Sequence, residues 1–292
     1  MRGRREVPAA GSGQPGDGPG PGHGREPETA GRGGGAASGG TAKSPVLVLS
    51  YAYSGAARVQ DLLAAGTNLA CTSGTGIIPL ADAAAETWRR VEGQPAEAMS
   101  HLAVSTIRGL VAAQVTLILS GSGQSRWCEL VTAPPSAVGP FLQIYPQTGF
   151  VCVHRSCTDV IRAGVQASPW GLYGQGLMPY LSSFPGNTVA ALAAYWLNSA
   201  EELLAFEMAN AGISYRVRYE DVLADPDQAL ATVRASLRLD GTAPGAALLG
   251  FFDSPEPDTA GQPPGPVPAE MIPEPLRERI GRLHAGLGYP PL

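Results

Sequence analysis

Short apolar runs alternate with amphipathic segments along the chain from residue 45 onward. Apolar runs too short for a helix predict buried strands, and apolar positions three or four residues apart predict helices. Strands alternating with helices indicate βαβ units, so the sequence predicts an α/β fold with a mainly parallel sheet flanked by helices. The predicted strands are 45–50, 126–131, 150–153 and 213–219, and the predicted helices are 56–65, 79–92, 102–119, 136–145, 156–167, 187–211, 225–239 and 272–287.

The first 42 residues break this pattern. They contain 14 Gly and 5 Pro, and their large apolar residues are Met1 and Val7 alone. Such a segment cannot bury enough apolar surface to offset the entropy of ordering it. We therefore predict a disordered tail over 1–42 and a single domain over 43–292.

The charge balance argues against several classes of protein. The net charge is −5, and the chain from Lys43 onward has 15 basic and 21 acidic residues, which does not favour nucleic-acid binding. The pattern shows no apolar run near the length of a membrane span and no apolar stretch after Arg2, Arg4 and Arg5 that would make a secretory signal. The four cysteines show no metal-ligand spacing, so free thiols in a reducing cytoplasm are expected. No metal site is predicted, and the sequence does not indicate an oligomeric state.

The basic residues are almost all arginine. Of the 20, Lys43 is the one lysine. Chemistry that requires a lysine must use Lys43, and the absence of a GxxxxGK[ST] motif excludes a standard P-loop NTPase.

Polar residues follow three of the predicted strands. Residues 50–58 form a turn of small residues that opens a helix, where backbone N–H groups and Ser54 make a cradle for an anion. His154 and Arg155 follow 150–153, and an arginine there is placed to bind a phosphate. Residues 217–226 end a strand in Tyr-Glu-Asp and open a helix at Asp-Pro. Each segment also has an ordinary interpretation: a strand-to-helix turn, a solvated arginine, and an N-cap.

Taken together, these segments resemble sulfotransferases that use 3′-phosphoadenosine-5′-phosphosulfate (PAPS). Residues 52–57 are similar to the family's P-K-S-G-T-T-like loop, and 155–160 are similar to its R-x-P-x-D-V segment. Residues 219–226 match Y-E-D-L-x-x-D-P closely, and 287–289 match a final L-G-Y. The resemblance implies a three-layer, P-loop-NTPase-like fold and transfer of a sulfuryl group from PAPS, as co-substrate, to a hydroxyl of a small molecule.

The resemblance also implies roles for individual residues. The turn Tyr53, Ser54, Gly55, Ala56 and Ala57 would hold the 5′-phosphosulfate end of PAPS. Arg155 would bind the 3′-phosphate, and Tyr219 would place a ring near the adenine. Ser50 and Tyr51 would form the strand exit without contacting the reacting groups.

The chain departs from the family pattern where charge matters most. Tyr53 stands in place of the loop lysine, Arg58 in place of a tryptophan that often follows the loop, and Ala163 in place of a serine. A cation near the transferring group stabilises it better than a neutral phenol does. We therefore expect Arg58, which is the next cation along the first helix, to substitute for the lysine.

Two residues compete as the base that accepts the acceptor's proton. Glu129 lies in the segment 129–132 that aligns with the family's base-carrying segment, and burial would raise its pKa toward neutrality. His101 opens a helix, and His154 is better interpreted as an orienting residue.

Residues 72–76 are interpreted as a connection bordering the acceptor cleft. Three aromatic residues in the irregular, lid-like segment 169–187 line that cleft or pack in a core: Trp170, Tyr173 and Tyr180.

Two further functions remain open at this point. A sulfotransferase-like module that binds a nucleotide without catalysis is favoured by the missing loop lysine. A nucleotide-dependent kinase with an unusual loop is less well supported, because no acid follows the loop where it would hold Mg²⁺.

Overall fold

The computed structural model describes residues 44–93, 99–131, 133–167, 176–239, 249–250 and 267–292. The tail 1–42, Trp170, Tyr173 and nearly all of the loop-rich segment 241–268 lie outside the described residues, so the predictions made for them stay predictions.

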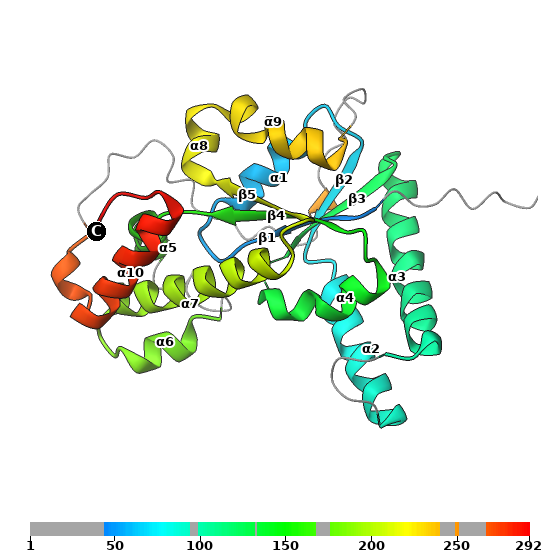
Figure 1. Cartoon of the computed structure of the whole chain (residues 1–292), viewed down its shortest axis with the longest axis horizontal. Coiled ribbons are helices and arrows are strands. Elements are labelled where there is room, and N and C mark those ends of the chain that lie inside the picture. Colours follow the sequence, from blue (N-terminus) through cyan, green and yellow to red (C-terminus); the bar gives the residue numbers. More distant parts are fainter. Residues whose placement is uncertain (1–43, 94–98, 132, 168–175, 240–248, 251–266) are drawn as a thin grey trace, which may run out of the picture. The chain divides into compact units, whose positions relative to one another are not determined.

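A parallel sheet forms the centre of the described fold (Figure 1). Its strand order is β5-β4-β1-β3-β2-β6, and every pair of neighbouring strands is parallel. β1 lies between β3 and β4, with Leu47 level with Glu129 on one side and Phe150 on the other. The strands are β1 (Val46–Leu49), β2 (Leu69–Ser73), β3 (Arg126–Val131), β4 (Gly149–His154), β5 (Ser214–Arg218) and β6 (Leu249–Gly250).

Helices cover both faces of this sheet. Val46 and Val48 face a core shared with α1, α8 and α9, whereas Leu47 and Leu49 face a core shared with α2, α3, α4 and α7. Because both faces of β1 are covered, all four of its residues are apolar and buried. The three-layer α/β fold predicted from the sequence is confirmed.

The helices are α1 (Ala56–Ala64), α2 (Ile77–Glu92), α3 (His101–Ser122), α4 (Gly139–Ile144), α5 (Cys157–Ala167), α6 (Met178–Ser183), α7 (Thr188–Ala209), α8 (Tyr219–Ala224), α9 (Pro226–Leu237) and α10 (Glu274–Leu287), with short 3₁₀ turns at Pro135–Val138 and Ala269–Met271.

The sequence pattern missed several short elements. Residues 72–76 were expected to be a connection, but Thr72 and Ser73 belong to strand β2 (Leu69–Ser73), whose three buried apolar residues are too few to stand out as an apolar run. The segment 169–187 contains α6, and the strand predicted over 213–219 ends at Arg218, where α8 begins. The four cysteines are free and buried, as expected.

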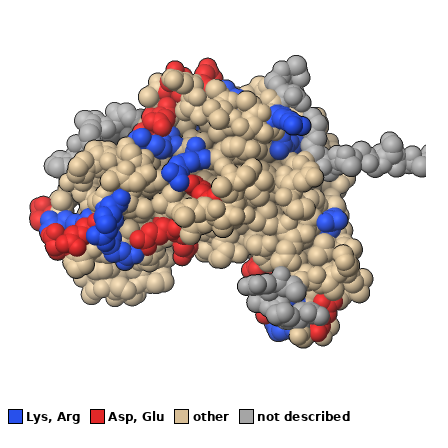
Figure 2. Space-filling view, in the orientation of Figure 1, with Lys and Arg blue, Asp and Glu red and all other residues tan. Residues whose placement is uncertain are grey.

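The statement that no apolar run approaches a membrane span needs correction at α3. An 18-residue window of this helix has a mean hydropathy of 1.8, and only 22% of it is buried. Arg108, the one Lys or Arg of this helix, interrupts the apolar run in the sequence, but the mean hydropathy of the window is still high. The described helix packs against α2 and α4, but most of its apolar window is exposed, unlike the mostly buried core helices that pass the same length and composition test. One such helix is weak evidence for a membrane span. Figure 2 shows a surface over α3 with little charge.

The turn between β1 and α1 is held in an unusual backbone conformation. Tyr53 and Gly55 both have positive φ, 65° and 80°, and Gly55 is the N-cap of α1. A side chain on Gly55 would place its Cβ 2.3 Å from Cε2 of Tyr219, on α8. The ring of Tyr219 therefore occupies the space that a non-glycine residue would need.

We predict that Gly55→Ala is more destabilising than Gly66→Ala, which also has positive φ (69°) but no atom near the new Cβ. The left-handed backbone alone costs about 1–2 kcal/mol, and overpacking against Tyr219 adds about 1–3 kcal/mol at position 55 only. Urea unfolding of both variants and the wild type measures the difference. Equal losses in the free energy of unfolding would contradict the close packing of Tyr219.

Candidate functional site

Three loops meet at one edge of the sheet. β5, β4 and β1 are neighbours and parallel, so the residues that follow them lie together at the carboxyl ends of the strands. Ligands of open α/β sheets bind at this edge. The structure thus brings together the three segments that the sequence singled out.

Arg155 is the most connected residue of this group. It is 7% exposed, and its Nη1 donates a hydrogen bond to the carbonyl oxygen of Tyr53 at 2.9 Å. Its guanidinium carbon lies 4.8 Å from the ring centroid of Tyr219, an arrangement that permits a cation–π interaction. Since Tyr219 also packs against Gly55, the predicted donor-site residues Tyr53, Gly55, Arg155 and Tyr219 form one contact group.

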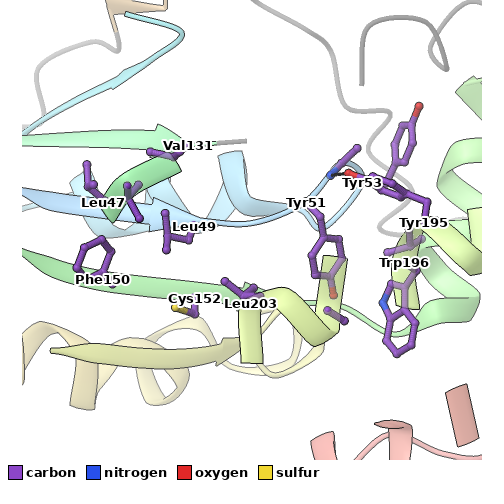
Figure 3. Close-up of a cluster of buried hydrophobic side chains, with 14 of the residues drawn as sticks. Leu47, Leu49, Tyr51, Tyr53, Val131, Phe150, Cys152, Tyr195, Trp196 and Leu203 are labelled. Carbon is purple, nitrogen blue, oxygen red and sulfur yellow. Dashed lines mark hydrogen bonds between the residues drawn. The ribbon is translucent and has the colours of Figure 1, made fainter. Parts of the chain in front are cut away.

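The backbone of Arg155 is fixed by two aromatic side chains. The Tyr51 hydroxyl accepts a hydrogen bond from Arg155 N (2.9 Å) and donates one to Arg155 O (3.0 Å), and Trp196 Nε1 also donates to this oxygen (2.8 Å). Figure 3 shows Tyr51 beyond the end of β1 and Trp196 near it on α7. Tyr51, expected only to form the strand exit, therefore positions Arg155. Nothing in the apolar pattern of 187–211 distinguished Trp196, because its role depends on a distant backbone oxygen.

The start of α1 can accept an anion. Ala56 and Ala57 begin the helix, and its first turn has no acidic residue. The Ser54 hydroxyl is fully buried and has no hydrogen-bond partner among the described residues. A buried polar group of this kind normally finds a partner, and an anion at the helix N-terminus would provide one.

Tyr53 replaces a cation with a buried, neutral ring. The residue is 4% exposed, and a non-glycine residue with φ of 65° is uncommon. Arg58 is the third residue of α1, so the helix begins early enough for the substitution expected from the sequence. Its side chain is exposed, and it lies close enough to Asp61 to limit the rise in the pKa of this carboxyl that burial causes.

Glu129 is buried on β3 and held by two threonines. Its Oε1 accepts hydrogen bonds from Thr75 N (3.0 Å) and Thr75 Oγ1 (2.9 Å), and its Oε2 accepts one from Thr72 Oγ1. Burial raises the pKa of Glu129, and the bonds from both threonines oppose this shift. Three of about four acceptor positions of the carboxylate are thus used, which leaves one to receive a proton.

The depth of Glu129 limits what it can reach. It is level with Leu47, two residues or about 7 Å before the end of β1. Its contact with open space is a cavity of about 210 Å³ that it lines together with Gly74, Val131 and Ala133.

His101, the other candidate base, lies far from Glu129. The start of α2, at Ile77, follows Thr75, which binds Glu129. The end of α2 lies near His101, because Ser100 donates a hydrogen bond to Glu92 there. A helix of 16 residues is about 24 Å long, so His101, which is exposed, is far from Glu129. The structure does not bring His101 to the site, because the helix that it opens starts at the far end of α2.

His154 is a buried structural residue in this site. Its Nε2 lies 2.6 Å from Oε1 of Glu207 on α7, and Glu207 also pairs with Arg216 on β5. Burial alone would raise the pKa of Glu207, but His154 and Arg216 together hold it below its usual range. The pair connects β4 and β5 to α7 directly behind Arg155.

Glu220 is a further residue of the site, which the sequence analysis did not single out although it lies in the Tyr-Glu-Asp segment. Its Oε1 accepts a hydrogen bond from the backbone N of Ser156 at 2.8 Å. Burial raises its pKa, and the hydrogen bond from Ser156 N opposes this rise more than the charge of Arg155 does. The carboxyl therefore joins α8 to the residue that follows Arg155.

The family model for the sulfotransferase family matches residues 45–243. Among solved structures, the sulfotransferase domain from the curacin biosynthetic pathway is similar, with a TM-score of 0.51 and 16% identity, over 85% of this chain and 98% of that one. The sulfotransferase domain of the Synechococcus PCC 7002 olefin synthase (TM-score 0.48, 14% identity, 85% and 96% covered) and a sulfotransferase from Alicyclobacillus acidocaldarius (0.48, 11%, 85% and 97%) are further matches. No curated protein sequence matches the chain.

The matched residues 45–243 include all three strand-end segments, and the curacin domain shares the fold that brings them together. The chain belongs to the sulfotransferase family.

Proposed function

We propose that this protein transfers a sulfuryl group from PAPS to a hydroxyl of a small molecule. The observation that carries the proposal is the contact group of Arg155, Tyr219, Gly55 and Tyr53, which joins three segments distant in sequence at the carboxyl edge of the sheet. Membership of the sulfotransferase family supports the reaction class. We place the activity in the cytoplasm, in agreement with four buried free thiols.

The negatively charged phosphate and phosphosulfate groups of PAPS match the groups that this site offers, which are the N-terminus of α1 and the guanidinium of Arg155. The 5′-phosphosulfate would lie at the N-terminus of α1, where Ser54 offers a hydroxyl and the backbone of Gly55, Ala56 and Ala57 offers N–H groups. Arg155 would bind the 3′-phosphate. A guanidinium has five N–H donors, so it can hold the Tyr53 carbonyl and a phosphate together. The Tyr219 ring would lie beside the adenosine.

The reaction requires charge stabilisation more than covalent help from the protein. The acceptor oxygen forms a bond to sulfur, the bond from sulfur to the bridging phosphate oxygen breaks, and 3′,5′-adenosine bisphosphate leaves. The acceptor's proton would pass to Glu129. Arg58 would stabilise the charge that develops on the bridging oxygen, because Tyr53 brings no cation there.

A second candidate is a module that binds the nucleotide but does not catalyse transfer. The specific observation in its favour is the buried ring of Tyr53 at the place of the loop lysine. Arg155 and Tyr219 serve binding in both cases, so catalysis is what separates the two.

Arg155→Ala should weaken binding of 3′,5′-adenosine bisphosphate by about 2–3 kcal/mol, the scale of a charge-assisted hydrogen bond to a phosphate. Binding of adenosine 5′-phosphate should weaken much less, because this ligand lacks the 3′-phosphate and would lose only the support that Arg155 gives to the turn. Calorimetric titration of both ligands measures this, and a melting curve confirms that the variant is folded. Equal losses for both ligands would exclude Arg155 from binding the 3′-phosphate.

Arg58→Ala should lower turnover about 10²–10³-fold, as loss of one charge donor in a transition state does. Bisphosphate affinity should fall much less, since that product lacks the sulfuryl group. Transfer of radiolabelled sulfate to phenols and sugars gives the rates. Arg58→Lys should retain part of the activity, and Arg90→Ala, at an exposed position on α2, is the matched control.

Two outcomes of that experiment would change the assignment. Full turnover by Arg58→Ala would exclude Arg58 as the substitute for the lysine. A wild-type protein that binds bisphosphate but transfers sulfate to no acceptor would support the non-catalytic module.

The pH dependence of turnover should identify the base. If Glu129 takes the proton it must be ionised, so turnover should fall as the pH drops through its pKa, which burial raises above the usual range of glutamate. Thr75→Val removes a hydrogen bond to the ionised form and should move this acid limb to higher pH, while Thr75→Ser should leave it in place. An acid limb unmoved in Thr75→Val would argue against Glu129 as the base.

A further inference from the structure

A second cavity lies directly beside the donor-site turn. Its volume is about 390 Å³, and Ser50 and Tyr51, the residues that lead from β1 into the turn, form part of its wall. Tyr195 of α7, which also lines it, accepts a hydrogen bond from Ala52 N at 2.8 Å. The cavity is therefore attached to the segment that would hold the phosphosulfate, and its volume suits a small organic ligand.

The charge of this cavity is opposite to that of the donor site. Among the described residues that line it, Glu202 of α7 is the charged one, and none is Lys or Arg. Glu202 forms no ion pair with any residue in the part of the chain that the structure describes, unlike its neighbour Glu201, which pairs with Arg279 at 2.7 Å. An unpaired carboxylate at a cavity wall favours a cationic ligand.

Aromatic rings form much of the remaining wall. Tyr180 of α6 and Tyr195 of α7 meet edge to face with centroids 5.6 Å apart, and Tyr51 lines the cavity as well. The faces of such rings attract an ammonium group. Aromatic walls and a carboxylate together select for an amine on an apolar body.

The wall also offers a hydrogen-bonding group without a partner. Ser50 is 8% exposed, and its hydroxyl makes no hydrogen bond to any described residue. A buried hydroxyl without a partner is unusual in a native protein, and a ligand hydroxyl would satisfy it. Since Ser50 is next to the turn, this places the ligand's hydroxyl end toward the transferring group and its amine end toward Glu202. Ser50, expected from the sequence to form only the strand exit, would then contact the reacting hydroxyl.

We infer that this cavity binds the acceptor, and that the acceptor class is a small aromatic hydroxyl compound carrying a positively charged amine. The inference rests on the proposed function for the reaction itself. It adds a preference for cationic acceptors, which the charge of Glu202 would provide. Ala133 lines both this cavity and the smaller one that Glu129 lines, so the two cavities share a wall residue.

Three phenols of similar size test the inference, because they differ mainly in charge: tyramine (positive), 4-ethylphenol (neutral) and 4-hydroxyphenylacetate (negative). Calorimetry of the full-length protein, with and without 3′,5′-adenosine bisphosphate, should give the tightest binding for tyramine and the weakest for 4-hydroxyphenylacetate. Glu202 is exposed, so Glu202→Gln should weaken tyramine binding by no more than about fivefold, the upper end for an exposed charge pair, and should leave 4-ethylphenol binding unchanged. Glu201→Gln is the matched control and should change neither.

The outcomes separate this inference from the proposed function. Tyramine binding no tighter than 4-ethylphenol binding, or an equal effect of Glu202→Gln on both ligands, would overturn the inference even if sulfate transfer occurs. Failure to bind 3′,5′-adenosine bisphosphate would instead overturn the proposed function, while charge-dependent binding of the phenols would still support a cationic ligand in the cavity.

Discussion

The site depends on how the chain buries the guanidinium of Arg155. A buried cation is costly unless polar partners replace its water, and here the Tyr53 carbonyl and the ring of Tyr219 do so. These partners come from the β1–α1 turn and from α8, so the contact that compensates the charge also fixes the turn against α8. Tyr51 and Trp196 then hold the backbone of Arg155 from the other side.

The fold was predictable where a strand is apolar on both faces. β1 and β4 have this property because helices cover the sheet on both sides, and their sequences carry that signal without any other information. β2 does not, because its polar residue Thr72 is satisfied by distant partners: its hydroxyl bonds to Glu129, and Trp127 Nε1 donates to it at 2.8 Å. A strand stabilised by hydrogen bonds across 55 or more residues leaves no local pattern.

The same distinction applies to the candidate site. Polar residues at the ends of apolar strands can be found from sequence, since parallel strands end at one edge, and Arg155 and Tyr219 were predicted in this way. Tyr51 and Trp196 were not, because each binds backbone atoms of Arg155, and a backbone atom has no signature in the sequence. Nor could the sequence separate Glu129 from His101, as that choice depends on the direction in which α2 carries the chain away from the sheet.

The two arginines of the proposed donor site differ in how far they are organised before a ligand binds. Arg155 is buried and fixed by its contacts, so it can select a ligand with little loss of side-chain entropy. Arg58 is exposed on the first turn of α1 and must give up about 2 kcal/mol of rotamer freedom to engage the bridging oxygen. A lysine at the place of buried Tyr53 would lie in the turn itself. If Arg58 replaces that lysine, as proposed, the cation would move from the preformed turn to a side chain that the bound donor must order. Donor binding would then be preorganised, while charge stabilisation would form only with the donor bound.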